Sequence, residues 1–156
     1  MVAVSSTAMF PQQPIHLYAA CTAANTTLSD TPDNTIEIVL PADIETDGGQ
    51  IVGLWAVPRA TVTATVLRMY TSLDNATTKR EALVQLAAAD TVSTTDAPTP
   101  VYFEYLGSKI SQSNPFLLPP GTGSAKFELW VSISVALAAG WIFHCQIAKF
   151  TKATVG

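Results

Sequence analysis

Residues 125–151 read AKFELWVSISVALAAGWIFHCQIAKFT, and this stretch decides the predicted fold. In its first half, apolar residues alternate with more polar ones from Phe127 to Val135. A period of two residues is typical of a strand with one buried face and one wetter face. The second half, from Trp141 onward, is rich in β-branched and aromatic residues, which favour strands, and Gly140 provides a flexible point between the halves. We therefore predict a long antiparallel hairpin as the central pair of an all-β domain.

Further strand patterns occur along the chain, separated by turn-forming residues. We predict strands at 15–24, 35–40, 51–57, 61–71, 79–89 and 101–105, in addition to the two halves of the hairpin. Residues 79–89 also contain good helix formers, but they lack helical caps at both ends and sit between strands, so we favour a strand. Asp47-Gly48-Gly49 is the strongest hairpin signal and predicts a turn at 43–50. About eight antiparallel strands of this kind predict a β-sandwich, with the jelly roll as the specific form considered.

Composition points to a protein that meets other proteins. The chain has 156 residues, the size of one domain, and only 13% of them are charged, whereas an ordinary soluble domain has about 25%. A shortage of surface charge predicts that much of the surface contacts protein, with a Thr- and Ser-rich surface as the alternative. The formal net charge is −4 and the basic residues are scattered, so we expect no nucleic-acid partner.

The uncharged run from Leu129 to Ala148 is long enough for a transmembrane helix by count alone. It contains Ser132, Ser134 and His144, and its first half alternates, so strands explain it better and we expect no membrane partner. The start of the chain lacks the basic segment of a secretory signal.

Two segments predict contacts with a partner. The first is an extended N-terminal arm at residues 1–14, followed by a single domain at 15–156; the arm contains two prolines, and the first charge in the chain is Asp30. Such an arm either adds an edge strand to its own domain or lies on a neighbour. The second is the loop at 114–121, where apolar residues indicate a tucked plug or a contact surface. The predicted partner contacts are Val2, Val4, Met9, Phe10, Pro11, Phe116, Leu117, Leu118 and Pro119.

No motif in the chain identifies a reaction. His16 and His144 are the only histidines, and nucleophilic catalysis would also need a Ser or Cys within reach and an orienting carboxylate. Cys145 follows His144, but adjacent strand residues point to opposite faces, which also disfavours a metal site. A calcium loop beginning at Asp43 would need Glu at its twelfth position, which is Leu54. We therefore expect a protein that is not an enzyme, with no catalytic, cofactor-binding or metal-binding residues.

The cysteines and the aromatic residues leave alternatives open. Cys21 and Cys145 each lie in an apolar, strand-like run, and we interpret them as buried free thiols in a reducing compartment, with a disulfide as the alternative. Core and inter-subunit packing is the commoner use of aromatic rings, but a sugar-stacking surface is the alternative. The candidates for that surface are Trp55, Trp130, Trp141, Tyr102, Phe103 and Tyr105.

Two segments resemble a pattern in small virion proteins of tailed bacteriophages. Residues 66–79, VLRMYTSLDNATTK, are similar to a strand that ends near Ser-x-Asp and leads through a polar loop to Thr-Lys-Arg. Residues 137–146, LAAGWIFHCQ, resemble the Leu-Ala-x-Gly-hydrophobic-x-Phe ending of the same group. The first 30 residues show no such likeness. Members of this group are structural components with no known reaction, so the resemblance implies no catalytic residues.

The resemblance and the composition together lead to one hypothesis. We expect a capsid decoration (cement) protein that binds the major capsid protein in the assembled head shell and stabilises the shell by mass action. Because capsid lattices present symmetric positions, we also expect a homotrimer. The protein would be located in the virion, after assembly in the cytoplasm of the bacterial host. The alternatives are a tail or fibre-base component and, from another class, a carbohydrate-binding β-sandwich module.

Overall fold

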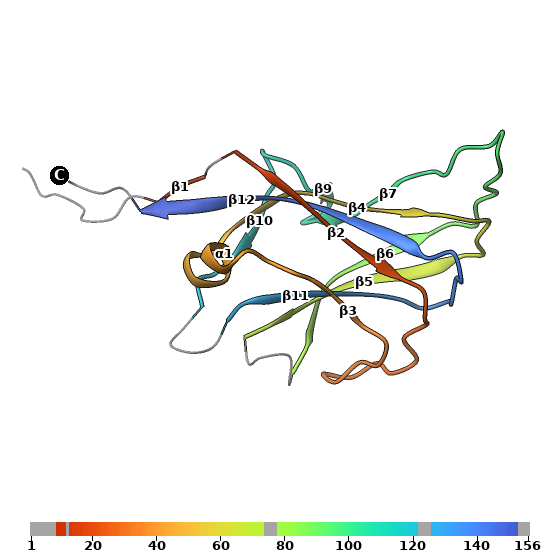
Figure 1. Cartoon of the computed structure of the whole chain (residues 1–156), viewed down its shortest axis with the longest axis horizontal. Coiled ribbons are helices and arrows are strands. Elements are labelled where there is room, and N and C mark those ends of the chain that lie inside the picture. Colours follow the sequence, from red (N-terminus) through yellow and green to blue (C-terminus); the bar gives the residue numbers. More distant parts are fainter. Residues whose placement is uncertain (1–8, 12, 74–77, 122–125, 153–156) are drawn as a thin grey trace, which may run out of the picture.

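Two antiparallel sheets lie face to face in the computed structural model (Figure 1). It describes residues 9–11, 13–73, 78–121 and 126–152. The first sheet contains β1 (Met9–Pro11), β2 (Ile15–Cys21), β4 (Gly49–Pro58), β7 (Val101–Tyr102), β10 (Phe116–Leu118) and β12 (Trp141–Lys152). The second contains, in spatial order, β3 (Ile36–Ile38), β11 (Glu128–Ile133), β5 (Thr65–Ser72) and β6 (Arg80–Ala87). The remaining elements are the pair β8 (Glu104–Tyr105) and β9 (Ser108–Lys109), and one helix, α1 (Ala42–Asp47).

The prediction of an all-β sandwich is confirmed, and the jelly-roll connectivity stays a prediction. The strand predicted at 79–89 is confirmed as β6, although its sequence contains helix formers. The strand predicted at 101–105 is divided between β7 in the first sheet and β8, which pairs with β9. Tertiary pairing with β5 therefore outweighs the local helix propensity of 79–89, as is common for short amphipathic segments.

The central hairpin predicted from residues 125–151 is wrong. Its two halves do form strands, but β11 pairs with β3 and β5, whereas β12 pairs with β1, β2 and β4 in the opposite sheet. The chain crosses between the sheets over residues 134–140. Hydrogen bonds attach the beginning of this crossing to the second sheet and its end to the first sheet. Ser134 exchanges hydrogen bonds with Val66 of β5, and the Gly140 carbonyl accepts a hydrogen bond from the Arg59 amide at the end of β4. Both halves bury an apolar face because they face each other across the core.

The turn predicted at 43–50 is also wrong, because residues 42–47 form α1. Pro41 precedes the helix with its φ fixed at −60°, and Asp43 and Glu45 place negative charge in the first turn, where the helix dipole favours it. Gly48 ends the helix with a φ of 77°. The strands on either side of this segment therefore do not form a hairpin: β3 lies in the second sheet and β4 in the first.

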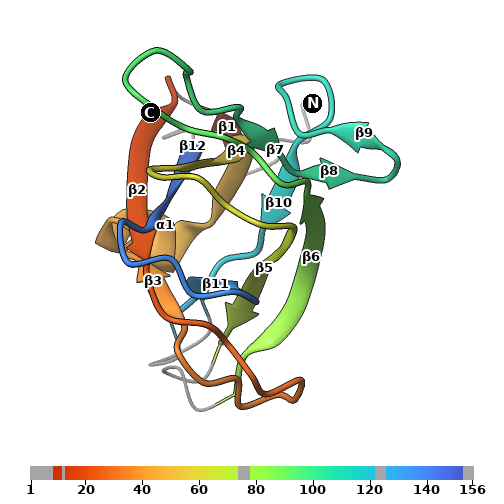
Figure 2. The ribbon, with the colours of Figure 1, turned by 90° about the vertical axis from the view of Figure 1, so that its right-hand side faces the viewer.

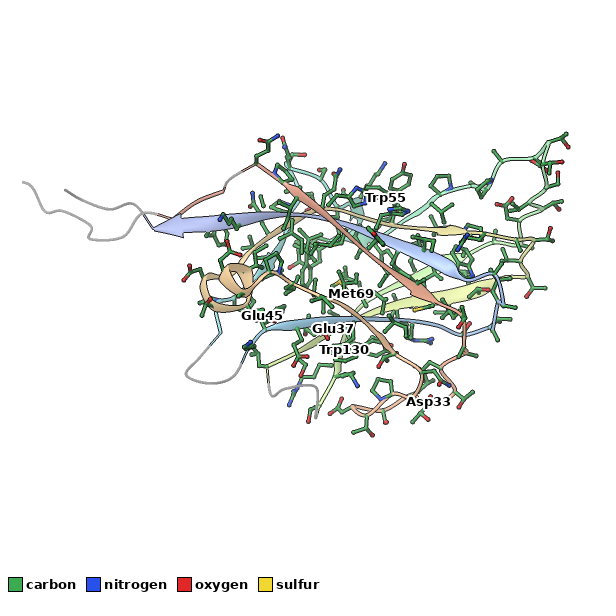
Figure 3. All side chains as sticks on the ribbon, viewed as in Figure 1. Asp33, Glu37, Glu45, Trp55, Met69 and Trp130 are labelled. Atoms are coloured by element: carbon green, nitrogen blue, oxygen red, sulfur yellow. The ribbon has the colours of Figure 1, made fainter. Side chains whose placement is uncertain are left out.

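The core lies between the two sheets. Figure 3 places Met69 between them, with Trp55 and Trp130 on opposite outer sides. Leu129, Val131 and Ile133 of β11 are fully buried, as the alternation predicts. The largest fully buried side chains, other than Met69 and those of β11, are Trp141, Tyr70, Phe103, Phe143, Ile38, Ile44, Ile51, Leu54, Leu67 and Leu118.

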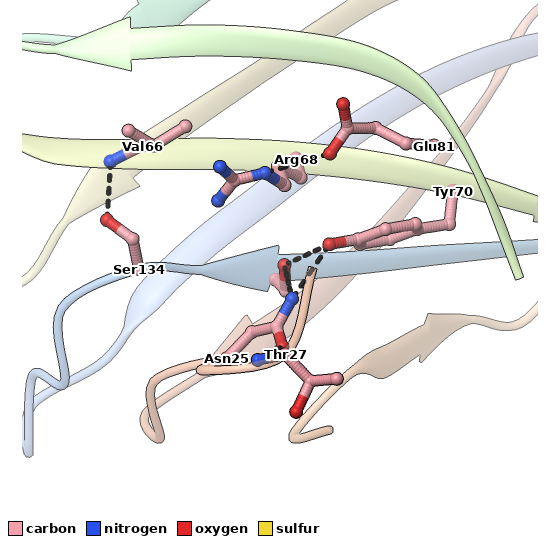
Figure 4. A network of polar contacts seen from close by, with 8 residues as sticks. Asn25, Thr27, Val66, Arg68, Tyr70, Glu81 and Ser134 are labelled. Carbon is pink, nitrogen blue, oxygen red and sulfur yellow. Dashed lines mark hydrogen bonds and ion pairs between the residues drawn. The ribbon is translucent and has the colours of Figure 1, made fainter. Parts of the chain in front are cut away.

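A loop over residues 22–35 covers part of the outer face of the second sheet, where Figure 4 shows a polar network. The Asn25 amide donates to the Tyr70 hydroxyl at 2.8 Å and to the Ser132 hydroxyl at 3.5 Å, and the two hydroxyls lie 3.2 Å apart. All three side chains are buried, so their mutual hydrogen bonds avoid the cost of buried polar groups without partners. This network explains why Ser132 is buried although the sequence pattern places it on the wetter face.

Gly48, which ends α1 and precedes β4, lies directly against the backbone of a neighbouring segment. A Cβ atom at this position would lie 2.5 Å from the Leu118 carbonyl oxygen and 3.0 Å from the Pro120 nitrogen, so the chain that follows β10 packs directly against the glycine backbone. Its backbone angles, φ 77° and ψ −175°, lie in a region that essentially only glycine adopts.

We expect Gly48→Ala to lower the free energy of unfolding by roughly 3 kcal/mol or more, because backbone strain and a steric clash add together. Gly107→Ala is the matched control: its φ is also 77°, but nothing lies within 4 Å of its added Cβ, so we expect a loss of only about 1 kcal/mol. Urea unfolding of both variants measures the difference. Equal losses would show that the close approach of β10 does not constrain Gly48.

Candidate interaction surface

The two predicted contact segments each contribute a strand, β1 and β10, to the same end of the first sheet, although more than 100 residues separate these strands in the sequence. β1 pairs with the last residues of β12, and β10 pairs with the first residues of β4. Because Lys149 of β12 is opposite Gly49 of β4, the spatial order at this end is β1-β12-β4-β10. We call this end, formed by Met9–Pro11, Phe116–Leu118 and residues 149–152, the arm end; it lies at the left of Figure 1.

The structure assigns different positions to the predicted contact residues. Val2 and Val4 lie outside the described residues. Met9, Phe10 and Pro11 form β1, so this part of the arm adds an edge strand to its own domain. Pro11 suits an edge position because proline lacks a backbone donor.

The second predicted segment is an edge strand rather than a loose loop. Leu117 is 62% exposed and Pro119 is also exposed, so both are available for contact. Phe116 is half-buried and packs edge-on against Tyr105, with ring centroids 5.1 Å apart. The Leu118 side chain is 1% exposed and belongs to the core, so it is left out of the proposed contact surface.

Helix α1 holds the arm end in place. The Lys149 ammonium lies 2.7 Å from the Asp43 carboxylate, and this hydrogen bond lowers the pKa of Asp43 below its ordinary range. Glu45 forms a second ion pair, with Lys126 at 3.2 Å, and its backbone carbonyl accepts a hydrogen bond from the Gly121 amide. The helix thus ties β12 and the chain that follows β10 to each other.

A second group of side chains, which the sequence analysis did not bring together, lies on the outer face of the first sheet. We call His16, Trp55, Tyr102 and His144 the ring cluster. The register places Trp55 between His144 and Tyr102 on neighbouring strands. The Trp55 and His144 rings are stacked, with centroids 5.1 Å apart, and the Trp55 and Tyr102 centroids are 6.2 Å apart. Only the pairing of β2 and β4 with β12, and of β7 with β4, could reveal this cluster, and the sequence alone did not give these pairings.

The two histidines of the ring cluster are hydrogen-bonded to each other. His16 Nε2 and His144 Nδ1 lie 2.9 Å apart. Their ring centroids are 5.1 Å apart, which is close to the greatest separation that this N···N distance allows, so the two nitrogens point almost directly at each other. This is the geometry of a hydrogen bond, whereas a bound metal ion would have to fit between the nitrogens. Among the described residues, no group of three or more His, Cys, Asp or Glu side chains could hold a metal ion.

The proposed sugar-stacking set is dispersed in the structure. Trp141 and Phe103 are buried in the core, and Trp130 lies on the outer side of the second sheet with the Lys79 ammonium 4.3 Å from its ring centroid. Only Trp55 and Tyr102 come together, with their rings tilted by 39°. One face of Trp55 is stacked on His144, and the Lys109 ammonium lies over the Tyr102 ring. A carbohydrate platform needs open ring faces, so this arrangement does not favour that alternative.

Both cysteines are buried and free, as the preferred interpretation predicts. Cys21 is opposite Trp141 and Cys145 is opposite Leu17, so the two thiols lie several residues apart along the β2–β12 pair. Burial raises the pKa of Cys21 to about 12 and raises the pKa of Cys145 still further, so both thiols are protonated at neutral pH. His144 is on the outer face and Cys145 on the inner face, as adjacent strand residues must be.

Comparison with known proteins gives no relative: no protein-family model, curated protein or solved structure matches the chain. Within the described part of the chain, no helix is long and apolar enough to cross a membrane. The functional argument therefore depends on the surfaces themselves.

The His16–His144 pair predicts a pH-dependent stability. Burial, and then the charge of His16, lower the pKa of His144 below its ordinary value of 6.5. Because the folded protein favours the neutral ring, this contribution is present above the unfolded pKa and is lost as the pH falls through the lower folded pKa. We expect the free energy of unfolding to decrease between pH 7 and pH 5, and His144→Gln to remove part of that decrease. Urea unfolding at both pH values measures it.

His16→Gln serves as the control, because it removes the neighbouring charge and leaves His144 to titrate. Between pH 7 and pH 5, the free energy of unfolding of His16→Gln should fall by more than that of His144→Gln, since burial is the larger cause of the lowered pKa of His144. A decrease that is the same in the wild type and in His144→Gln would contradict this account of the pair.

Proposed function

We propose that this chain is a structural protein of a tailed-bacteriophage virion, namely a capsid decoration protein that binds the assembled head shell. The observation that carries the proposal is the arm end, where β1 and β10, which belong to the two segments predicted to contact a partner, lie on one sheet. The partner is then the major capsid protein, the protein self-associates as a homotrimer, and its place is in the virion. The resemblance of residues 66–79 and 137–146 to small virion proteins supports the same conclusion.

The chemistry of the arm end suits a protein partner. β1 and β10 are both short strands with one neighbour each in the described sheet, so their outer sides offer backbone groups for strand addition. Within β10, Leu117 adds an exposed apolar side chain to this surface. A decoration protein needs such a surface and no chemistry, because binding only the assembled shell already stabilises the shell by mass action.

Co-sedimentation with phage heads assembled without the protein tests the proposal. We expect saturation at a number of copies set by the symmetric positions of the lattice. We also expect Leu117→Lys to weaken binding roughly tenfold or more, because burial of a leucine side chain contributes about 1.5–3 kcal/mol. Binding is measured as bound copies per particle over a range of protein concentrations.

Leu28→Lys is the matched control, since Leu28 is 77% exposed in the loop over the second sheet, away from the arm end. It should leave binding unchanged. Saturation at only a few copies per particle would favour the alternative of a tail or fibre-base component. Absence of binding, or equal binding by Leu117→Lys and Leu28→Lys, would contradict the proposed surface.

A further inference from the structure

The border of the second sheet offers a strand-addition site that the proposed shell contact does not use. β6 is the outermost strand in the order β3-β11-β5-β6, so among the described residues only β5 pairs with its backbone. Figure 2 shows β6 along the right-hand border of the sandwich. β6 has eight residues, and β7 and β8 come close to it without pairing with it. An unpaired edge is a template for pairing with another chain unless charge, proline or a covering segment protects it.

The side chains of β6 do not protect this edge. Its charged residues, Arg80 and Glu81, are at its beginning, and residues 82–89 carry no charge and no proline. Val84 and Leu86 point to the outer face and are 49% and 67% exposed. Across the β5–β6 pair, Leu86 is opposite the half-buried Val66, whereas Val84 is opposite Arg68, so the exposed apolar stripe consists of Val84 and Leu86.

The N-terminal residues have the matching composition. Residues 1–8, MVAVSSTA, lie outside the described residues and contain no charge and no proline. Val2 and Val4 are two residues apart, which places both on one face of any extended strand. Residues 9–11 belong to the first sheet, where the end of β12 extends beyond the body of the sandwich (Figure 1), whereas β6 borders the second sheet. Residue 9, the first described residue, therefore lies at the arm end, on a different sheet from the unpaired edge of β6.

We infer that residues 1–8 of a second copy of this chain add as a strand to β6, with Val2 and Val4 against the Val84–Leu86 stripe. The contact joins two different surfaces, the arm of one copy and the β6 edge of the next, so it generates a closed ring when the rotation between copies closes. In a ring of three copies, the arm of each copy would pair with the β6 edge of the next copy. The inference deepens the proposed function by naming the self-contact within it.

The experiment mixes two separately purified variants, Val2→Cys and Leu86→Cys, under mild oxidation and without phage heads. We expect a disulfide-linked dimer of the two variants on a non-reducing gel, because the arm of one copy places residue 2 beside residue 86 of the other. The native cysteines do not interfere, since Cys21 and Cys145 are buried. A mixture of Val2→Cys with Val39→Cys is the control, because Val39 is apolar and 67% exposed, like Leu86, and follows β3 at the other edge of the second sheet.

Two further measurements complete the test. Deletion of residues 1–8 should abolish self-association in light scattering, and the double variant Val2→Cys/Leu86→Cys should form linked oligomers rather than internally linked monomers. Dimer formation no greater than in the Val39→Cys control, internally linked monomers, or self-association that survives the deletion would overturn the inference. Because no phage heads are present, this result does not depend on whether the protein binds a shell.

Discussion

The pairing of β12 with β4 is the constraint on which the first sheet depends. Nine residues of β12, from Trp141 to Lys149, are in register with β4. Every other strand of this sheet is bonded to one of these two: β1 and β2 to β12, and β7 and β10 to β4. The ring cluster on the outer face and the arm end both follow from this pairing, because both are made of neighbours of β12 and β4.

Glycine makes the close contacts of this pair possible at the arm end. A Cβ on Gly49 would lie 2.7 Å from the Ala148 carbonyl oxygen, and one on Gly48 would meet the chain after Leu118. The backbone of β4 therefore begins between two strands that pack directly against it. The local sequence Asp-Gly-Gly, which suggested a hairpin, instead ends a helix and admits these two neighbours.

The sequence predicted the strands better than their partners. The alternation from Phe127 to Ile133 identifies β11 and its buried face, because the pattern reflects one strand and its exposure. Pairing depends on tertiary contacts: residues 134–140 connect β11 and β12 across the sandwich, and nothing in their composition distinguishes this crossing from a wide hairpin. For the same reason the sequence did not predict the ring cluster, since His16 and His144 come together only through the register of β2 with β12. The sequence suggested the segments at 1–14 and 114–121 as contacts because apolar residues outside the strand patterns are conspicuous, but it did not predict the burial of Leu118.

A decoration protein that follows this design uses different parts of one sandwich for different partners. We propose the arm end for the shell contact and the β6 edge for the contact between copies, and the ring cluster lies on a third face. Hydrogen–deuterium exchange of the protein free and bound to phage heads tests the central claim most directly. The account predicts slower exchange at Phe116–Leu118 and Met9–Pro11 on binding, with no change in residues 91–100, at the opposite end of the molecule in Figure 1. Slower exchange at 91–100 with none at Phe116–Leu118 would contradict the account.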